Sequence, residues 1–258
     1  MTQEVQTQAP VKCEQCECRK SKIGDFTMAF QPIWNLKQGK LFGYEALVRG
    51  VNNESAFHVL SQVNDENKYH FDQQCRAKAI KLAAKLGLDT TLSINFLPNA
   101  VYEPEQCLAT TLRLADKYDF PISRIMFEFT EVEKMRDTDH LRNIVECYRK
   151  LGFLTAIDDF GAGYSGLSLL ADFQPNIAKL DMALIRNIDS STSRQVIVKN
   201  CMSMFKQLDI TVLAEGVETV EELAFLKGLE VDLVQGYLIA KPGFECLPKP
   251  DVALLSWS

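Results

Sequence analysis

Short apolar runs alternate with longer amphipathic stretches along the chain, starting at Phe26. The apolar runs are rich in branched and aromatic side chains, which is typical of buried strands. The stretches between them place alanine and leucine at helical spacing, most clearly in residues 67–86. Because strand patterns and helix patterns alternate, we expect a parallel sheet with crossover helices.

Two strand patterns at residues 26–36 and 41–48 flank a Lys-Gln-Gly-Lys turn, which predicts an opening hairpin. Further strands are predicted at residues 92–96, 124–129, 153–158, 177–180, 211–214 and 233–239. Helices are predicted at residues 54–63, 67–86, 104–118, 138–151, 167–173, 191–208 and 219–227. About eight strands favour a closed α/β fold, a (β/α)8 TIM-like barrel, over an open sheet.

Composition and charge narrow the class of protein. We expect a polar tail over residues 1–24 and one barrel domain over residues 25–258. With 47% hydrophobic and 24% charged residues, the chain is typical of soluble globular proteins. No apolar run approaches the roughly 18 residues that cross a bilayer, and the polar N-terminus lacks a signal-peptide pattern, so we expect a cytoplasmic protein without a membrane partner. The net charge of −6 argues against binding to nucleic acid polymers.

Polar side chains occur at the carboxyl ends of several predicted strands, where the chemistry of a (β/α) barrel takes place. They are Asn95, Glu128, Asp158, Asp159, Lys179, Asp181, Glu215 and Gln235, together with Glu45 inside its own apolar run. Any one of them alone would be attributed to a helix N-cap or a surface loop. Capping alone does not explain five strands that each end in a carboxylate or carboxamide, so we expect a shared site.

The types of these side chains indicate hard divalent metal ions. Asp158 and Asp159 are adjacent carboxylates, which is costly unless a cation neutralises them. Aspartate, glutamate and asparagine oxygens suit Mg²⁺ or Mn²⁺, and none of the three histidines lies at a strand end, which argues against a histidine-rich zinc hydrolase. Two cations bridged by one carboxylate would bind a phosphodiester and acidify a water molecule. Lys179 would then hold that water or a phosphoryl oxygen.

Two motifs point to other enzymes. Residues 161–166 match G-x-G-x-x-G, with Asp181 about 20 residues onward, as in dinucleotide-binding folds. Asp158 and Asp159 directly before this loop would repel a pyrophosphate, and a dinucleotide fold would leave the other strand-end acids unexplained. Residues 159–161 form Asp-Phe-Gly, but no kinase catalytic loop precedes them. We therefore disfavour the dehydrogenase interpretation and reject the kinase interpretation.

Residues 44–49, Tyr-Glu-Ala-Leu-Val-Arg, resemble the signature of EAL domains, the bacterial cyclic di-GMP phosphodiesterases. The resemblance covers residues 26–242, and seven further motifs occur in the order of the family. They are Gln31-Pro32-Ile33, Asn95, Glu128-Phe-Thr-Glu131, Asp158-Asp-Phe-Gly161, Lys179-Leu-Asp181, Glu215-Gly-Val-Glu218 and Gln235-Gly-Tyr237. A lone Glu-Ala-Leu triplet would carry no weight, whereas eight ordered motifs are highly specific.

The resemblance implies a barrel whose first strand runs antiparallel to the others, with two Mg²⁺ or Mn²⁺ ions at one end. The ligands of one ion would be Glu45, Asn95, Glu128 and Asp158, and those of the second would be Asp158, Asp159 and Glu215. Lys179 would orient the attacking water, and Gln235 would position water or metal ligands. Glu215 has also been considered as a general base in the family.

The resemblance further implies residues for substrate binding and for a mobile loop. Gln31 and Arg49 would contact the phosphate and guanine portions of the substrate, and Asp181 would assist near Lys179. The loop of residues 160–166 couples the site to the dimer interface in many members of the family. Residues that would steady or shape this loop are Glu131, Gly161, Gly163 and Glu218.

All metal ligands of the family pattern are present, so the resemblance implies a working hydrolase that opens cyclic di-GMP to linear pGpG. It also implies a homodimer. Two alternatives remain open. One is a receptor that binds cyclic di-GMP with little or no turnover, and the other is a catabolic barrel enzyme acting on a different phosphorylated substrate.

Cys13, Cys16 and Cys18 lie in the tail, outside the barrel resemblance. Three close thiols could bind zinc, but a structural zinc site has four ligands and no fourth is nearby. They could also be redox-active, because Lys12 and Arg19 would lower the pKa of neighbouring thiols. An incidental group of cysteines in a disordered tail is an equally good interpretation. The five other cysteines are scattered singly, as reduced structural cysteines usually are.

Overall fold

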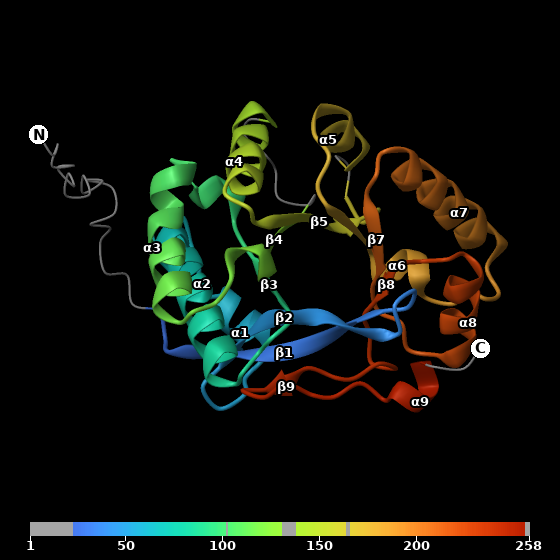
Figure 1. Cartoon of the computed structure of the whole chain (residues 1–258), viewed down its shortest axis with the longest axis horizontal. Coiled ribbons are helices and arrows are strands. Elements are labelled where there is room, and N and C mark those ends of the chain that lie inside the picture. Colours follow the sequence, from blue (N-terminus) through green and yellow to red (C-terminus); the bar gives the residue numbers. More distant parts are fainter. Residues whose placement is uncertain (1–22, 102, 131–137, 164–165, 256–258) are drawn as a thin grey trace, which may run out of the picture.

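The computed structural model describes residues 23–101, 103–130, 138–163 and 166–255, which form a closed barrel surrounded by helices (Figure 1). The strands follow the order β2-β3-β4-β5-β6-β7-β8-β1, and β1 also pairs with β2, which closes the sheet on itself. Neighbouring strands from β2 to β8 are parallel, whereas β1 is antiparallel to both β2 and β8. The predicted barrel with an antiparallel first strand is therefore confirmed.

Most strands and helices begin and end within two residues of their predicted bounds. The barrel strands are β1 (Phe26–Asn35), β2 (Lys40–Gly50), β3 (Thr91–Asn95), β4 (Ile125–Thr130), β5 (Leu154–Phe160), β6 (Ile177–Leu180), β7 (Thr211–Ala214) and β8 (Leu233–Val234). The main helices are α1 (Ala56–Leu60), α2 (Lys68–Lys85), α3 (Pro104–Lys117), α4 (Thr138–Lys150), α5 (Gly166–Asp172), α6 (Met182–Ile185), α7 (Thr192–Gln207) and α8 (Val220–Gly228). The shorter elements are η2 (Pro98–Ala100), η3 (Ile122–Arg124), β9 (Gly243–Phe244) and α9 (Val252–Leu255). Among the described residues, no helix combines the length and the apolar character that crossing a membrane requires.

Apolar side chains cover both faces of the sheet, because residues along a strand alternate between the barrel interior and the surrounding helices. The interior apolar cluster consists of Ile33, Met126, Ala156, Ile177, Leu213 and Leu233. A larger cluster lies between the sheet and the helices and includes Phe96, Phe127 and Tyr148. Burial of one large apolar side chain stabilises a fold by about 1.5–3 kcal/mol. Both clusters therefore hold the strands, and with them the strand ends, in fixed positions.

The last predicted strand, residues 233–239, is wrong in its length, because β8 ends at Val234. At Gly236 a Cβ atom would lie 2.1 Å from the carbonyl oxygen of Val217, so the two backbones approach as closely as only glycine allows. The chain then turns, and the amide of Ile239 donates to the carbonyl oxygen of Gly236 at 3.1 Å. Apolar residues that follow a close backbone contact were thus mistaken for a continuing strand.

Candidate metal centre

The predicted site residues lie at the carboxyl ends of the barrel strands, next to the interior apolar cluster. On β4 to β8, each apolar residue of that cluster is followed two positions later by a polar residue, which is the spacing that keeps both on one face of a strand. The pairs are Met126 with Glu128, Ala156 with Asp158, Ile177 with Lys179, Leu213 with Glu215 and Leu233 with Gln235. The apolar layer keeps water away from one side of the polar layer, which strengthens electrostatic interactions within it.

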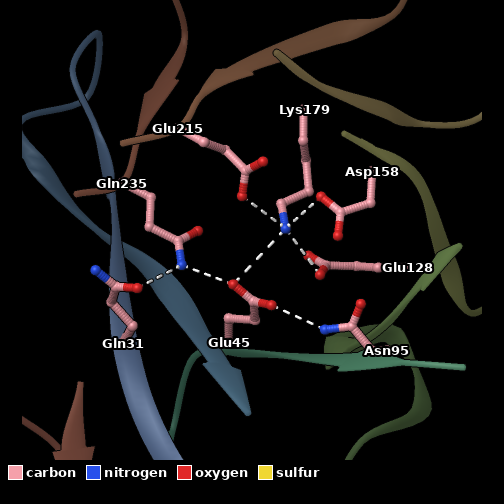
Figure 2. A network of polar contacts seen from close by, with 8 residues as sticks. All are labelled: Gln31, Glu45, Asn95, Glu128, Asp158, Lys179, Glu215 and Gln235. Atoms are coloured by element: carbon pink, nitrogen blue, oxygen red, sulfur yellow. Dashed lines mark hydrogen bonds and ion pairs between the residues drawn. The ribbon is translucent and has the colours of Figure 1, made fainter. Parts of the chain in front are cut away.

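The ammonium group of Lys179 lies among the carboxylates of this layer (Figure 2). Its Nζ atom is 2.9 Å from a carboxylate oxygen of each of Glu128, Asp158 and Glu215. A fourth carboxylate oxygen, Oε2 of Glu45, is 3.7 Å away. Only 1% of the Lys179 side chain is exposed, so these contacts are formed almost without water. Carboxylates from widely separated parts of the chain therefore meet around one buried cation.

Glu45 connects these carboxylates to a group of amide side chains. Nδ2 of Asn95 donates to Oε1 of Glu45 at 2.8 Å, and Nε2 of Gln235 donates to Oε2 of Glu45 at 2.7 Å. Nε2 of Gln235 also donates to Oε1 of Gln31 at 3.2 Å. Gln31 can take part because antiparallel β1 places it directly opposite Glu45. The eight side chains drawn in Figure 2 thus form one polar network.

A bulge in β5 brings both adjacent aspartates to the site. Between Ile157 and Phe160, β5 contains one residue more than the facing stretch of β6. Asp159 has a φ of 55°, in the left-handed region that residues other than glycine rarely adopt. In a regular strand, Asp158 and Asp159 would face opposite sides of the sheet. With the bulge, carboxylate oxygens of Asp158, Asp159 and Glu215 lie within 4.8 Å of one another.

The charges and donor atoms of this network fit two divalent cations. Together with Asp159, the network contains five carboxylates and one ammonium group. If all are ionised, they leave four net negative charges, which two divalent cations would neutralise. Oε1 of Glu128 and Oε1 of Gln235 are buried and have no hydrogen-bond partner among the described residues. Carboxylate and amide oxygens are the ligands that Mg²⁺ and Mn²⁺ prefer.

In the metal-free network, several carboxyl groups hold their protons more tightly than usual. Burial raises the pKa of Glu128 to about 8, with the charge of Lys179 opposing this shift and neighbouring carboxylates adding to it. Burial also raises the pKa of Glu215 well above its usual range, again against the charge of Lys179. Burial, followed by the charge of Asp158, raises the pKa of Asp159 to about 6. Metal ions and protons therefore compete for the same oxygen atoms.

The raised pKa of Glu128 predicts how the stability of the metal-free protein depends on pH. The pKa of Glu128 rises from an ordinary value of 4.5 to about 8 on folding, so the folded state binds the proton more tightly than the unfolded state. The resulting stabilisation is fully present below pH 4.5 and is lost as the pH rises to about 8. We expect the free energy of unfolding in EDTA to fall across this interval, as measured by urea denaturation at a series of pH values.

The Glu128→Gln variant is the control for this prediction, because its side chain does not titrate. Its free energy of unfolding in EDTA should fall less than that of the natural protein between pH 4.5 and about 8. Saturating Mg²⁺ should remove most of the decline in the natural protein, because metal binding is favoured as protons leave. An identical pH dependence in the two proteins would contradict the buried, proton-retaining state of Glu128.

Two cavities adjoin the network and share Glu45, Leu47, Asp158 and Asp159 as walls. The cavity beside α1 and α2 has a volume of about 390 Å³ and a mostly apolar lining. The cavity beside β6, β7 and β8 has a volume of about 520 Å³ and a more polar lining. Because carboxylates line both cavities, an elongated ligand that filled both would pass next to these carboxylates.

Two residues predicted to contact the substrate lie outside the ion-pair network. Arg49 follows Glu45 by four positions on β2, which places both on the same strand face. The guanidinium group of Arg49 donates to the carbonyl oxygen of Val48 at 2.7 Å. Asp181 accepts a hydrogen bond from the amide of Ala183 at 2.9 Å and so caps the N-terminus of α6. Helix N-capping is the role that the sequence would assign to any one of these acidic residues taken alone. Asp181 also lines the more polar cavity, and its role toward a substrate stays a prediction.

Two of the residues predicted to shape the loop after β5, Gly161 and Glu218, lie beside α6 or the residue that ends it. Gly161 has a φ of 100°, and a Cβ atom there would lie 2.6 Å from Cδ1 of Leu184. A side chain at this position would therefore be strained and would collide with α6. Gly163 lies in the same turn. Glu218 forms a bidentate ion pair with Arg186, with N–O distances of 2.6 and 2.7 Å.

Several predicted residues lie outside the described part of the chain. They are Glu131 of the loop and Cys13, Cys16 and Cys18 of the tail. Their predicted roles in loop stabilisation and in zinc or redox chemistry stay predictions, as does the division of the chain at residue 24. The described cysteines are free, in agreement with the expectation of reduced thiols, and they are Cys75, Cys107, Cys147, Cys201 and Cys246.

The sequence matches the EAL domain family over residues 17–242. The blue light- and temperature-regulated antirepressor BluF of Escherichia coli (strain K12) is 31% identical over 232 residues, covering 90% of this chain and 58% of BluF. The cyclic di-GMP phosphodiesterase RocR of Pseudomonas aeruginosa is 32% identical over 230 residues, covering 85% of this chain and 58% of RocR. The chain thus spans less than two thirds of the length of these relatives.

Solved structures with the same fold include proteins bound to a cyclic dinucleotide. A standalone versatile EAL protein from Vibrio cholerae O395, in its c-di-GMP bound form, is 62% identical with a TM-score of 0.87, covering 90% of this chain and 98% of that protein. BlrP1 from Klebsiella pneumoniae, in a manganese/cy-diGMP complex, is 35% identical with a TM-score of 0.80. That match covers 85% of this chain and 56% of BlrP1.

Proposed function

Because the chain belongs to the EAL domain family, we propose that it hydrolyses cyclic di-GMP to linear pGpG with two divalent cations, Mg²⁺ or Mn²⁺. The observation that carries this proposal is the meeting of Glu45, Glu128, Asp158 and Glu215 around Lys179. Retention of all these carboxylates favours an enzyme over a receptor, since a receptor would not need a complete ligand set. The c-di-GMP bound state of the Vibrio cholerae relative supports the choice of substrate.

The two cations would share the carboxylate of Asp158. One would be held by Glu45, Asn95, Glu128 and Asp158, and the other by Asp158, Asp159 and Glu215. The oxygen donors of these side chains and the four net negative charges support this assignment, and the manganese in the BlrP1 complex supports the type of metal. When bound, the cations would neutralise the phosphodiester and lower the pKa of a water molecule.

The other residues of the network would orient the reacting groups. Lys179, whose ammonium group is buried, would donate to the attacking water or to a phosphoryl oxygen. Gln235 would hold Glu45 in place through the hydrogen bond that it already donates. Gln31 and Arg49 would contact the substrate, whose two halves would occupy the two cavities beside the carboxylates. Glu215 would serve mainly as a metal ligand, because a general base needs a free carboxylate.

A homodimer is part of the same proposal. Two apolar side chains close to the loop after β5 are exposed, namely Leu167 of α5 at 66% and Met182 of α6 at 56%. A second copy of the chain could cover them, and the contact would then connect the dimer to the loop that carries Gly161.

The direct test is incubation of the pure protein with cyclic di-GMP and Mg²⁺ or Mn²⁺, followed by chromatography of the nucleotides. We expect conversion to pGpG, which EDTA should abolish. The Glu45→Ala variant should lose turnover by more than about 100-fold, because outer-shell partners of a metal site already contribute 10- to 100-fold. As a matched control, Glu146→Ala removes an exposed carboxylate on α4 and should leave turnover unchanged.

Two results would change the assignment. Unchanged nucleotide together with measurable binding would identify a receptor, the alternative that the sequence analysis left open. Retained turnover in the Glu45→Ala variant would show that the metal ligands have been wrongly assigned.

A further inference from the structure

A buried ion pair lies on α2, behind the strands that carry two of the proposed metal ligands. Oδ2 of Asp72 is 2.8 Å from Nη2 of Arg76, and each side chain is 1% exposed. Oδ1 of Asp72 accepts a hydrogen bond from the amide of Leu97 at 3.0 Å. Leu97 starts the turn from β3 into η2, two residues after Asn95. Asp72 therefore holds the backbone at the point where the chain leaves the proposed ligand Asn95.

Arg76 makes a second set of contacts with the same two strands. Its Cζ atom lies 4.9 Å from the ring centre of Phe127 and 5.5 Å from that of Phe96. Phe96 directly follows Asn95 and Phe127 directly precedes Glu128, so each ring belongs to the neighbour of a proposed ligand. The amide of Phe96 also donates to the carbonyl oxygen of Glu128 at 2.9 Å. The guanidinium group thus packs against both strands from the helix side.

A buried ion pair is energetically costly compared with apolar side chains that would fill the same volume. Burying two charges removes them from water, and an apolar pair of similar volume often stabilises a fold equally well or better. Nη1 of Arg76 donates to the hydroxyl of Tyr148 at 3.0 Å, but Nε has no hydrogen-bond partner among the described residues. The stability of the fold alone therefore does not account for a charged pair between α2 and the strands. Holding the Leu97 amide, in contrast, requires a hydrogen-bond acceptor such as the carboxylate of Asp72.

We propose that Asp72 and Arg76 are positioning residues for the metal ligand Asn95. Asp72 fixes the turn after β3 by accepting a hydrogen bond from the Leu97 amide. Arg76 holds Asp72 through their ion pair and also packs against Phe96 and Phe127, the rings next to Asn95 and Glu128. Together they set the direction in which the Asn95 side chain points toward Glu45. The inference rests on the proposed function only in assigning Asn95 to a metal ion.

The test replaces the pair with apolar residues and measures metal binding without nucleotide. We expect the Asp72→Leu/Arg76→Met double variant to unfold at a urea concentration close to that of the natural protein. Its Mn²⁺ dissociation constant, measured by the electron paramagnetic resonance signal of free Mn²⁺, should rise about 10- to 100-fold. The Arg142→Met variant is the control. It removes ion pairs with Asp139 of α4 and Asp172 of α5, leaves the contacts of Asp72 and Arg76 in place, and should bind Mn²⁺ as tightly as the natural protein.

A double-mutant cycle separates positioning from a general loosening of the structure. In an Asn95→Ala background, replacing Asp72 and Arg76 should weaken Mn²⁺ binding by less than about threefold, because the ligand that they position is already absent. Equal losses in the two backgrounds, or unchanged Mn²⁺ affinity in a folded double variant, would overturn the inference.

A second comparison remains decisive if the double variant does not fold. Asp72→Asn keeps an acceptor oxygen for the Leu97 amide and should bind Mn²⁺ more tightly than Asp72→Ala, which removes it. Equal affinities in these two variants would also overturn the inference. Metal binding without hydrolysis in the natural protein would instead contradict the proposed function alone.

Discussion

Replacement of Asp158 by asparagine is expected to lower the turnover of cyclic di-GMP by more than about 100-fold, the upper end of the effects seen for outer-shell residues of metal sites. Asp158 is the carboxylate proposed to contact both cations, so its loss weakens two metal sites at once. Asparagine has nearly the same shape but no charge. The bulge that orients residues 158 and 159 should therefore persist, and the effect should come from the lost charge.

The stability of this variant without metal should not fall with its turnover. Burial and then the charge of Asp158 raise the pKa of Asp159, so removing that charge relieves part of the repulsion between carboxylates in the metal-free cluster. Lys179 loses its ion pair with Asp158 but keeps its 2.9 Å contacts with Glu128 and Glu215. The free energy of unfolding in EDTA should consequently not decrease at pH 8, as measured by urea denaturation. Glu146→Gln, which removes the charge of an exposed carboxylate on α4, should change neither quantity. Turnover within tenfold of the natural protein would refute the shared-ligand role of Asp158.

Replacement of Lys179 by methionine should reduce turnover while strengthening metal binding. Removal of a group that stabilises developing charge in an active site costs about 10²- to 10³-fold in rate, and Lys179 is the buried cation of this site. The same ammonium group repels divalent cations that would bind to Glu128, Asp158 and Glu215. At an effective dielectric constant of 20, two unit charges 4 Å apart repel by about 4 kcal/mol, so Mn²⁺ affinity should rise by at least about tenfold.

The metal-free form of the same variant should be much less stable. Breaking a buried ion pair from one side typically destabilises a protein by about 3–5 kcal/mol, because the remaining charge has no partner. Urea denaturation in EDTA and in saturating Mn²⁺ would measure this loss and its recovery. The exposed Lys206 on α7 provides the control, and Lys206→Met should leave all three measurements unchanged. Weaker Mn²⁺ binding by Lys179→Met would contradict the proposed repulsion between the Lys179 ammonium group and the cations bound by these carboxylates.

The barrel could be predicted from the sequence because its strands and helices are short, regular and strongly patterned. The carboxylates at the strand ends could be located for the same reason, since parallel strands bring their carboxyl ends to one side of a barrel. Gln31 was harder to place. The predicted hairpin already made β1 antiparallel to β2, but only the family resemblance singled out Gln31, which this pairing places opposite Glu45.

Features that depend on contacts between distant backbones were not predicted. The bulge in β5 is one, although the consecutive Asp158 and Asp159 before Gly161 were a signal, because a regular strand cannot turn both side chains to one face. The early end of β8 is another, since it depends on the close approach of Gly236 to Val217.

The ion pair of Asp72 and Arg76 was also missed. Opposite charges four positions apart are common on exposed helix faces, so this spacing alone predicts little. The signal was that each directly follows a buried apolar residue, Asp72 after Phe71 and Arg76 after Cys75, with Ala79 also buried. Which side of α2 faces β3 and β4 became clear only with the packing of the helix against the barrel.

The most direct measurement of the central claim is anomalous diffraction from crystals of this protein grown with Mn²⁺. We expect two manganese peaks, one among Glu45, Asn95, Glu128 and Asp158 and the other among Asp158, Asp159 and Glu215. A fully occupied manganese ion elsewhere, with no peak within ligand distance of Asp158, would show that these convergent side chains do not form a metal centre.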